Sequence, residues 1–482
     1  MSGGGQRARR GPVLRALPRL ALLLLLAAWA AMGFWQTHKP LPPGTQLATR
    51  ACPAGPEAVN FIADVSAADA YGRPVISAAI LDEVLHAVRG ARRFIVLDYA
   101  RLRSAPAAAA PPRRVSGELT SALLEQRRAQ PQLVVLLLLD PANEAYGRAS
   151  TPELDLLRAN GIAVVPADLD ALRDANLLFA PLWRLGLRWW PHGGALAAQQ
   201  LRLKADHRKL LLADDGRDGL LGIVSSANMD DAQSGWSNLA ARVRGPVLAP
   251  LLAAELTLAQ RSGWRGPVAP FVASAIAECS GEGPLALQVL TEGAIGAALG
   301  RELEATVAGD AIDIAAYALA ERATIEALLA AARRGVRVRL ILDPQEDARS
   351  TTATGLPNQP VASALVARSG GAIQVRWYRT HGEHFHGALA LVSGPQRAWL
   401  MLGSANFTRR SLGDYDLEAD VAVRMERSEP LAQQALGYYD ALWSNRAALG
   451  IEYTADFAAF ADPSQTDYWL GRVLEGVGVS AF

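Results

Sequence analysis

Residues 205–228 read ADHRKLLLADDGRDGLLGIVSSAN, a pattern typical of two neighbouring β-strands joined by a turn rich in glycine and aspartate. His207 and Lys209 are two residues apart, so on a strand their side chains point to the same face. Ser226 and Asn228 follow on the next strand. A cation and a histidine beside hydroxyl and amide groups form a set of hydrogen-bonding groups suited to a phosphate. The stretch therefore predicts a strand pair that carries a phosphate-binding site.

A second stretch repeats part of this pattern. His386 stands 179 residues after His207, and Asn406 stands 178 residues after Asn228. The near-equal separations fix the alignment of the two copies, in which Ser404 takes the place of the first serine. A chain that carries one pattern twice is expected to contain two copies of one structural unit.

The segments before each stretch also recur. A helical apolar pattern over residues 119–129 leads to a strand-like run over residues 132–139, and residues 324–335 lead in the same way to residues 336–342. Both strand-like runs are followed by Asp-Pro. The alternation of helix and strand predicts an α/β fold, and a cluster of glycine and proline at residues 262–284 marks the boundary between the copies.

The spacing His-x-Lys-(x)4-Asp followed by Ser-x-Asn resembles the motif of the phospholipase D superfamily, whose members carry it twice. The resemblance covers roughly residues 60–460. It implies two similar α/β/α lobes, an internal duplication, packed with the active site at their interface. We expect the first lobe at residues 52–262 and the second at residues 284–470, after an N-terminal hydrophobic anchor and proline-rich linker at residues 1–45.

The resemblance also implies the roles of single residues. One histidine attacks phosphorus to form a phosphohistidine and the other protonates the leaving alcohol, which divides one displacement into two easier steps. His207 is expected to be the nucleophile, because its motif is complete, and His386 the acid–base. The residues implied to be catalytic are His207, Lys209, Asp214 and His386, and those implied to bind phosphate are Lys209, Ser226, Asn228, Ser404 and Asn406. Arg410, Ser411 and Glu418 lie where such proteins place supporting polar residues, and no metal or other cofactor is expected.

The second copy of the motif is incomplete. Ala388 stands where the family has lysine, and Ser393 stands where it has aspartate. Losing one electrostatic contact of this kind costs about 3 kcal/mol in the reaction barrier, or about a hundredfold in rate. The favoured function is a phosphodiesterase or phosphatidyltransferase acting on phospholipid, of the kind seen in phospholipases D and cardiolipin synthases. A phospholipid-binding pseudoenzyme and a nuclease of the same superfamily are the alternatives.

The N-terminus has the layout of a signal anchor. Residues 1–19 contain five arginines and no acid, and the uncharged run Leu20–Trp35 follows. The run is sixteen residues long, between the core of a signal peptide and the ~20 residues that span a bilayer comfortably. Cleavage near residues 28–30 is the alternative to the favoured uncleaved anchor. Arginines on the cytoplasmic side would place the body on the extracytoplasmic (periplasmic) side, with membrane and phospholipid as partners.

Charge and cysteine content bear on the other functions. The 482-residue chain has a net charge of +1, and because residues 1–19 contribute five positive charges, the remainder carries −4. An acidic body disfavours nucleic acid as a partner. Cys52 and Cys279 could pair in an oxidising compartment, but two unpaired cysteines are the favoured expectation. The oligomeric state stays open.

Two further patterns have competing interpretations. His381, His384 and His386 could suggest a metal site, but the motif already accounts for His386 and no metal site is expected. Residues 177–191 mix aromatic residues, leucines and two arginines without an acid. This segment is either an interfacial segment that leads lipid towards the site or inter-lobe core, and the lipid interpretation is slightly favoured.

Overall fold

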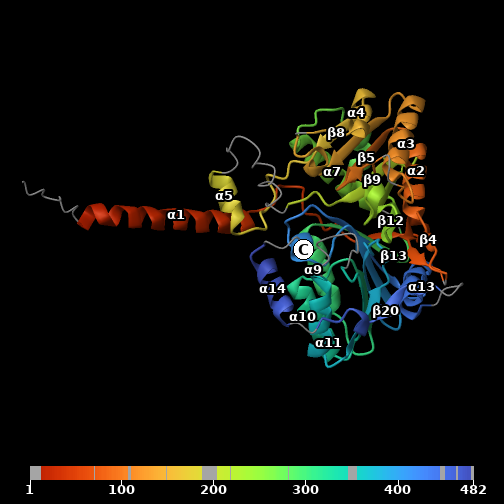
Figure 1. Cartoon of the computed structure of the whole chain (residues 1–482). Helices are drawn as coiled ribbons and strands as arrows, with labels where there is room; N and C mark the ends of the chain where they lie inside the picture. The colour runs from red at the N-terminus through yellow and green to blue at the C-terminus, as the bar shows by residue number, and fades with distance from the viewer. Residues whose placement is uncertain are drawn as a thin grey trace, which may run out of the picture.

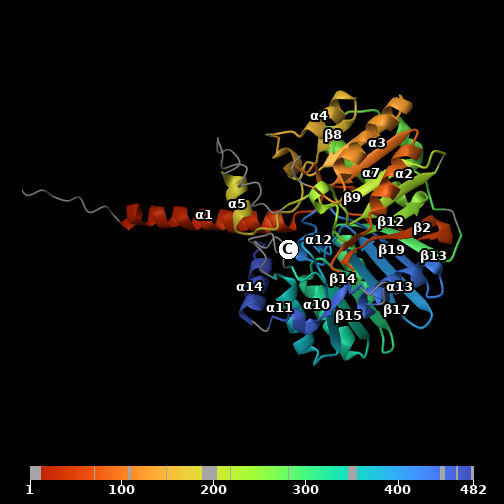
Figure 2. The same ribbon diagram turned by 45° about the vertical axis from the view of Figure 1, so that its right-hand side comes forward.

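The structure is a computed structural model that describes residues 12–69, 71–106, 110–147, 149–186, 204–217, 219–279, 282–345, 355–445, 451–462 and 465–478. Two α/β lobes lie one above the other in Figure 1, and helix α1 (Pro12–His38) projects from one side of the body. The same arrangement is visible after a turn of 45° in Figure 2.

Each lobe is built on one large sheet. The first sheet lies in the spatial order β2 (Val59–Asp64), β12 (Asn238–Arg244), β10 (Leu220–Ser225), β9 (Lys209–Asp214), β5 (Phe94–Tyr99), β7 (Val134–Leu139) and β8 (Ala163–Pro166). The second lies in the order β1 (Cys52–Ala54), β13 (Leu285–Thr291), β19 (Ala419–Glu426), β18 (Arg397–Gly403), β17 (Ala388–Ser393), β14 (Ala311–Ala316), β15 (Arg337–Leu342), β16 (Ile373–Tyr378) and β20 (Thr454–Asp456). Without its two edge strands the second sheet repeats the first strand for strand. The expected α/β fold with two similar lobes is confirmed.

Amphipathic helices cover the sheets. In α2, for example, the buried residues Ile80, Val84 and Val88 recur every four positions along one face. The helices between β2 and the inter-lobe linker are α2 (Ala79–Gly90), α3 (Val115–Ala129), α4 (Pro152–Ala159), α5 (Phe179–Leu185), α7 (Ala249–Arg261) and α8 (Ala269–Ala275). Those of the second lobe are α9 (Gly293–Glu304), α10 (Arg322–Arg333), α11 (Asn358–Arg368), α12 (Arg409–Leu412), α13 (Pro430–Ser444) and α14 (Gln465–Gly476).

The hydrophobic core joins the two lobes into one body. Its largest cluster combines Phe94 and Leu210 of the first sheet with Leu389 and Leu400 of the second. Every residue of β9 is buried, which is why its sequence is a run of leucines without polar alternation. The strands that carry the predicted site are therefore held from both faces.

Two features at the lobe boundaries differ from the sequence-based expectation. β1 pairs with β13, so residues 52–54 belong to the second sheet and not to the first lobe. Cys52 and Cys279 form a disulfide with their Cα atoms 5.5 Å apart, so the expectation of two unpaired cysteines was wrong. The two cysteines are 227 residues apart in sequence, and their meeting depends on this return of the chain to the second sheet.

Helix α1 leaves the body and is largely exposed. Its segment Pro18–His38, 21 residues long, is long and apolar enough to cross a membrane. The neighbouring α5 packs beside α1, where Trp29 Nε1 donates a hydrogen bond to the Leu178 carbonyl at 3.3 Å. The described part of segment 177–191 thus lies beside α1 rather than between the sheets. Residues 187–191 lie outside the described residues.

Candidate active site

The backbone at each histidine is held by the opposite lobe. The His207 N–H donates to the Leu417 carbonyl at 2.9 Å, and the Leu417 N–H donates back to the Ala205 carbonyl at 3.0 Å. In the same way the His386 N–H donates to the Ser237 carbonyl at 2.8 Å. Each histidine therefore occupies a fixed position only when the two lobes are packed together.

Aspartates that follow β7 and β15 brace the same two segments. Asp140 accepts a hydrogen bond from the Asp206 N–H at 2.8 Å, and Asp343 accepts one from the Phe385 N–H at 2.8 Å. Burial raises the pKa of Asp140 to about 6. Both aspartates belong to the repeated Asp-Pro signal, and each fixes the residue directly before a histidine.

The two histidines face one cavity at the lobe interface. Their ring centroids are 6.5 Å apart, which leaves room for a tetrahedral phosphoryl group with contacts of about 3 Å to each ring. The cavity has a volume of about 560 Å³. Its polar lining includes His207, Asn228 and Arg101 of the first lobe and His386, Asn406 and Arg410 of the second.

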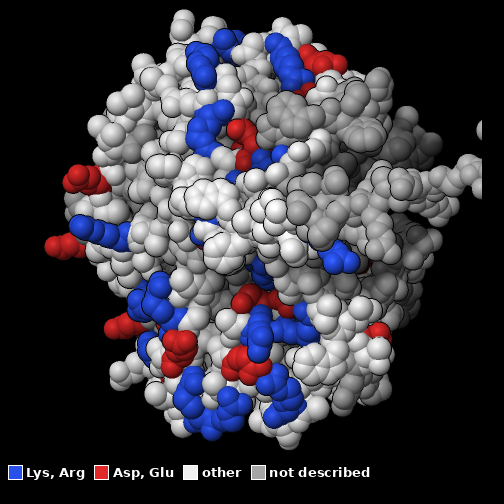
Figure 3. Space-filling model, turned by 90° about the vertical axis from the view of Figure 1, so that its left-hand side faces the viewer, with Lys and Arg blue, Asp and Glu red and all other residues white. Residues whose placement is uncertain are grey.

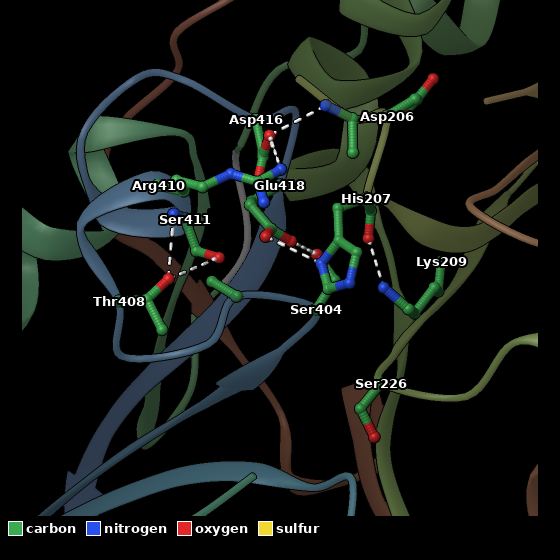
Figure 4. A network of polar contacts seen from close by, with 12 residues as sticks. Asp206, His207, Lys209, Ser226, Ser404, Thr408, Arg410, Ser411, Asp416 and Glu418 are labelled. Carbon is green, nitrogen blue, oxygen red and sulfur yellow. Dashed lines mark hydrogen bonds and ion pairs between the residues drawn. The ribbon is translucent and has the colours of Figure 1, made fainter. Parts of the chain in front are cut away.

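His207 is oriented by a carboxyl group of the other lobe. Its Nδ1 lies 2.9 Å from Glu418 Oε1, and the Ser404 hydroxyl donates to the second oxygen of Glu418 (Figure 4). Burial, and then the charge of Lys209, lower the pKa of His207, while burial raises the pKa of Glu418 to about 8. With the Nδ1 proton donated to Glu418, Nε2 keeps a lone pair for attack on an electrophile.

His386 has a different partner. Its Nδ1 lies 3.0 Å from the Ser226 carbonyl and 3.2 Å from Asn238 Oδ1. Both oxygens only accept hydrogen bonds, so Nδ1 carries the proton. Burial, and then Lys209, lower the pKa of His386. Asn238 begins β12 as Glu418 precedes β19, so the first lobe supplies an amide where the second supplies a carboxyl group.

Lys209 is fully buried beside the two histidines. Its Nζ donates to the His207 carbonyl at 2.6 Å, and burial lowers its pKa to about 8. In the second lobe Ala388 occupies the matching first position of β17 and provides no charge. The rings of Tyr317 and Trp236 lie 5.0 and 5.3 Å from the His386 ring instead. One side of the site is therefore cationic and the other aromatic.

Asp214 lies away from the cavity, at the opposite end of β9 from Lys209. Its carboxylate accepts hydrogen bonds from the N–H groups of Arg92, Arg93 and Phe94, the shortest at 2.8 Å. The resemblance had implied a catalytic place for Asp214. The structure instead gives it the role of closing the start of β5, because a strand of six residues separates its two ends by roughly 16 Å.

The two serines implied to bind phosphate hold protein groups instead. Ser226 donates to Asn238 Oδ1 at 3.0 Å, Ser404 donates to Glu418, and both serines are buried. Each serine thus positions the group that orients a histidine. The amides Asn228 and Asn406 do line the cavity, as expected, and remain available for phosphate.

Two arginines complete the charged wall of the cavity. Arg101 is about half exposed and lies 3.9 Å from an oxygen of Asp230, while Arg410 is paired with Asp416 at 2.9 Å. Arg410 and Ser411 were expected near the site, whereas Arg101 carries no motif signal in the sequence. Within the described part of the chain no group of three or more histidine, cysteine, aspartate or glutamate side chains is arranged to hold a metal ion.

Comparison with a family model places the second lobe. The model described as "Cardiolipin synthase, PLD-like domain" matches residues 304–443, which include His386, Ser404 and Asn406. The curated proteins contain no match to this chain.

Solved structures share the fold at low sequence identity. A phosphatidylserine synthase from Haemophilus influenzae Rd KW20 has a TM-score of 0.57 and 11% identity, over 94% of this chain and 100% of that one. A polyphosphate kinase from Porphyromonas gingivalis has a TM-score of 0.47 and 13% identity, over 87% of this chain and 53% of that one. Nuc, a phospholipase D family member from Salmonella typhimurium, has a TM-score of 0.27 and 20% identity, over 36% of this chain and 97% of that one.

The first of these structures bears on the fold alone, and it agrees with the two sheets of equal strand order. The family model covers the lobe in which the motif is incomplete, and the complete motif lies in the other lobe. Taken with the paired histidines at the lobe interface, these findings identify the chain as a member of the phospholipase D superfamily.

Proposed function

We propose that the protein is a phosphodiesterase or phosphatidyltransferase that acts on phospholipids through a phosphohistidine intermediate. The observation that carries the proposal is the placement of two buried imidazoles, one from each lobe, on a single cavity with ring centroids 6.5 Å apart. Two groups that can exchange a proton or attack phosphorus are what a two-step displacement requires.

In the first step Nε2 of His207 forms a bond to phosphorus, and the bond from phosphorus to the leaving alcohol oxygen breaks. The imidazole of His207 becomes cationic as the bond forms, and the carboxyl group of Glu418 at 2.9 Å stabilises that charge. His386 gives a proton from Nε2 to the leaving oxygen. The negative charge of a bound phosphodiester raises the pKa of both histidines relative to the empty site, which favours the protonated acid.

In the second step a water or an alcohol attacks the phosphohistidine. His386, now neutral, takes the proton of the attacking hydroxyl, and the bond from phosphorus to His207 breaks. Water gives a phosphatidic acid, and an alcohol gives a new phospholipid. The geometry at His386 serves both acceptors equally, so the reaction class covers hydrolysis and transfer.

Phosphate neutralisation rests on an unequal set of groups. Lys209, Asn228 and Asn406 contact or line the space between the histidines, and Ala388 adds no charge. We assign the missing positive charge to Arg101 and to Arg410, which line the same cavity from opposite lobes. Arginine suits this place because its fixed fork of donors matches phosphate oxygens.

Phospholipid is the proposed substrate class for three reasons. The matched family model is described by its cardiolipin synthase members, and a structure of the same fold is a phosphatidylserine synthase. Helix α1 is apolar enough to anchor the chain beside lipid. The disulfide between Cys52 and Cys279 suits an oxidising, extracytoplasmic (periplasmic) location of the body.

A phospholipid-binding pseudoenzyme is the second candidate. It is favoured by Ala388, and also by Asn238, since an amide cannot compensate a charge on His386 as a carboxylate would. A nuclease of the same superfamily is disfavoured, because the chain after residue 19 carries a net charge of −4.

The test compares substrates and variants of the full-length protein in detergent–lipid micelles. Labelled phosphatidylglycerol and a labelled oligonucleotide are supplied to the native protein, to His207→Ala and to His86→Ala, which changes an exposed histidine of α2. Head-group release by the native protein and His86→Ala, abolished in His207→Ala, supports the enzyme. Lipid binding without turnover of either substrate would favour the pseudoenzyme, and cleavage of the oligonucleotide alone the nuclease.

A further inference from the structure

Helices α5 and α14 lie on either side of the point where α1 leaves the body. The Leu177 N–H, just before α5, donates to the Val477 carbonyl, just after α14, at 3.2 Å. Gly33 of α1 approaches the Leu177 carbonyl so closely that an added Cβ would lie 3.2 Å from it. Figures 1 and 2 both show α5 and α14 on the side of the body from which α1 projects.

These two helices expose apolar side chains that have no role in the core. Leu178, Leu182 and Leu185 recur at helical spacing along α5 and its first flanking residue, and about half of each residue is exposed. On α14, Trp469, Leu470 and Val473 share a second stripe. Their exposed fractions are 63%, 48% and 59%. Exposed leucine and tryptophan at this spacing are typical of helices that lie in a membrane interface.

The length of α1 gives an independent reason to expect lipid at this level. The uncharged run Leu20–Trp35 has sixteen residues and rises about 24 Å, whereas the hydrocarbon core of a bilayer is about 30 Å thick. The last part of that run is already docked, since Trp29 bonds to Leu178 and Gly33 touches the segment before α5. The run therefore spans the bilayer only if the adjoining part of the body enters it.

We propose that the exposed stripes of α5 and α14, the α5/α14 surface, sink into the outer leaflet of the bilayer that α1 crosses. The proposal rests on the anchoring role proposed for α1 and goes beyond it. Figure 3 faces this side of the body and shows a largely uncharged middle, with lysine and arginine side chains above and below. Phe34 and Trp35 of α1 are exposed in the same region and continue the apolar surface.

Lipid fits this surface better than a protein partner does. The stripes adjoin a membrane-spanning segment, so they lie at the depth of the lipid whenever α1 is inserted. Contact by three helices would fix the orientation of the body against the bilayer, whereas one helix alone would leave the body free to turn. A fixed orientation keeps the lobe interface at a constant height above the phospholipid head groups.

The test measures the depth of single labelled positions in the full-length protein. The native cysteines form a disulfide, so a new cysteine is the one thiol that takes a fluorophore. The protein is reconstituted into vesicles of equal amounts of phosphatidylcholine and phosphatidylglycerol that contain nitroxide-labelled lipid as quencher. The labelled variants are Leu24→Cys in α1, Leu182→Cys in α5, Trp469→Cys in α14 and Tyr71→Cys, an exposed position at the β3–β4 hairpin (Ser66–Ala68 and Pro74–Ile76) on the far side of the body.

We expect fluorescence to fall at least about twofold at positions 24, 182 and 469, and to stay unchanged at position 71. Quenching at position 24 but not at positions 182 and 469 would overturn the α5/α14 surface and leave the anchor intact. If position 182 is shielded from a water-soluble quencher yet untouched by the lipid quencher, a protein covers it and the proposal also fails. Absence of quenching at position 24 would contradict the anchor itself, which separates the two failures.

Discussion

His207 and His386 differ in what their Nδ1 atoms meet, and this difference assigns their roles. A carboxyl group at 2.9 Å supports a positive charge on His207, which arises when its Nε2 bonds to phosphorus. The carbonyl and amide oxygens at His386 give weaker support, so that ring releases a proton more readily. The contacts therefore agree with His207 as nucleophile and His386 as acid–base, independently of the completeness of the motif.

The first prediction concerns Glu418, a positioning residue for His207. Glu418→Gln keeps the shape and an acceptor oxygen for Nδ1 but removes the charge that stabilises the cationic ring. We expect kcat/KM to fall about ten- to a hundredfold, mainly through kcat, and the pH–activity profile to shift. Steady-state kinetics on phosphatidylglycerol between pH 6 and 9 measures both effects.

Glu426→Gln, at the exposed end of the same strand, is the matched control and should behave as the native protein. An unchanged pH profile in Glu418→Gln, with activity lost only in proportion to folded protein, would reduce Glu418 to a structural role.

The second prediction concerns the charge that Ala388 does not supply. Arg101→Gln removes a half-exposed guanidinium from the cavity wall without disturbing the core. We expect kcat/KM to fall about a hundredfold, as for the loss of one contact to the transferring phosphoryl group. Arg128→Gln on the exposed face of α3 serves as control, and equal rates for the two variants would show that Arg101 does not touch the substrate.

The sequence predicted the chemistry of single residues better than their contacts. The repeat brought His207, His386, Asn228 and Asn406 into one expected site, and all four line the cavity. Ser226 and Ser404 matched the motif equally well, but spacing does not reveal that their hydroxyls bond to Asn238 and Glu418. The near-constant offset between the copies would have paired Asn238 with Glu418, because both stand just before or at the start of matching strands.

At the scale of elements, the two ends of β9 have different tasks. Lys209 begins the strand beside the histidines, and Asp214 ends it against three backbone N–H groups of the turn before β5. Ser393 ends β17 in the second lobe, where its hydroxyl accepts a hydrogen bond from Arg427 at 3.3 Å. The missing aspartate of the second motif therefore bears on strand closure, and only the missing lysine bears on chemistry.

The third prediction follows from this division. Asp214→Ala leaves three N–H groups without their acceptor, so the free energy of unfolding should fall by on the order of 3 kcal/mol. Activity per folded molecule at low temperature should stay near that of the native protein. Urea unfolding measures the first effect, with the exposed Asp155→Ala as control. Complete loss of activity in a stably folded Asp214→Ala protein would restore the catalytic role.

Elements with strong periodicity were predictable, and those defined by distant partners were not. The run of leucines in β9 and the helix–strand alternation before it follow from local pattern. β1 is three residues long, and its place beside β13 depends on a strand more than 200 residues away. The described part of segment 177–191 contacts α1 and not the inter-lobe core, because its partner is the leader rather than either sheet.

At the scale of the whole molecule, the packed lobes bury several carboxyl groups. Burial raises the pKa of Asp64 to about 7, that of Glu292 to about 7 and that of Asp420 to about 8. The folded state therefore favours the protonated form of these acids, whereas the unfolded chain releases the protons near pH 4. Their contribution to stability is complete at low pH and is lost as the pH rises towards 8.

The fourth prediction is that the free energy of unfolding decreases between pH 6.5 and pH 8. The window begins at the ordinary pKa of histidine, because the lowered pKa values of His207 and His386 reduce stability only as the pH falls below that value. Urea unfolding at several pH values measures the slope. Asp420→Asn should flatten it and the exposed Asp155→Asn should not, and a rise in stability over this window would contradict the assignment.

The architecture of the whole molecule was the most predictable level, since a repeated pattern in one chain implies two units of one fold. The shared core and the exchange of backbone hydrogen bonds at the two histidines were not predictable, because they arise from packing one lobe on the other. The same packing makes the site a property of the pair of lobes, with each histidine depending on its opposite lobe.

The most direct test of the division of labour between the histidines is to trap the intermediate. The native protein, His207→Asn and His386→Asn are incubated with phosphatidylglycerol, quenched without acid and digested, and the peptides are weighed by mass spectrometry. The expected result is a phosphatidyl adduct on the peptide that contains His207, more abundant in His386→Asn and absent from His207→Asn. An adduct on His386, or turnover by His207→Asn at the native rate, would contradict the assignment of His207 as the nucleophile.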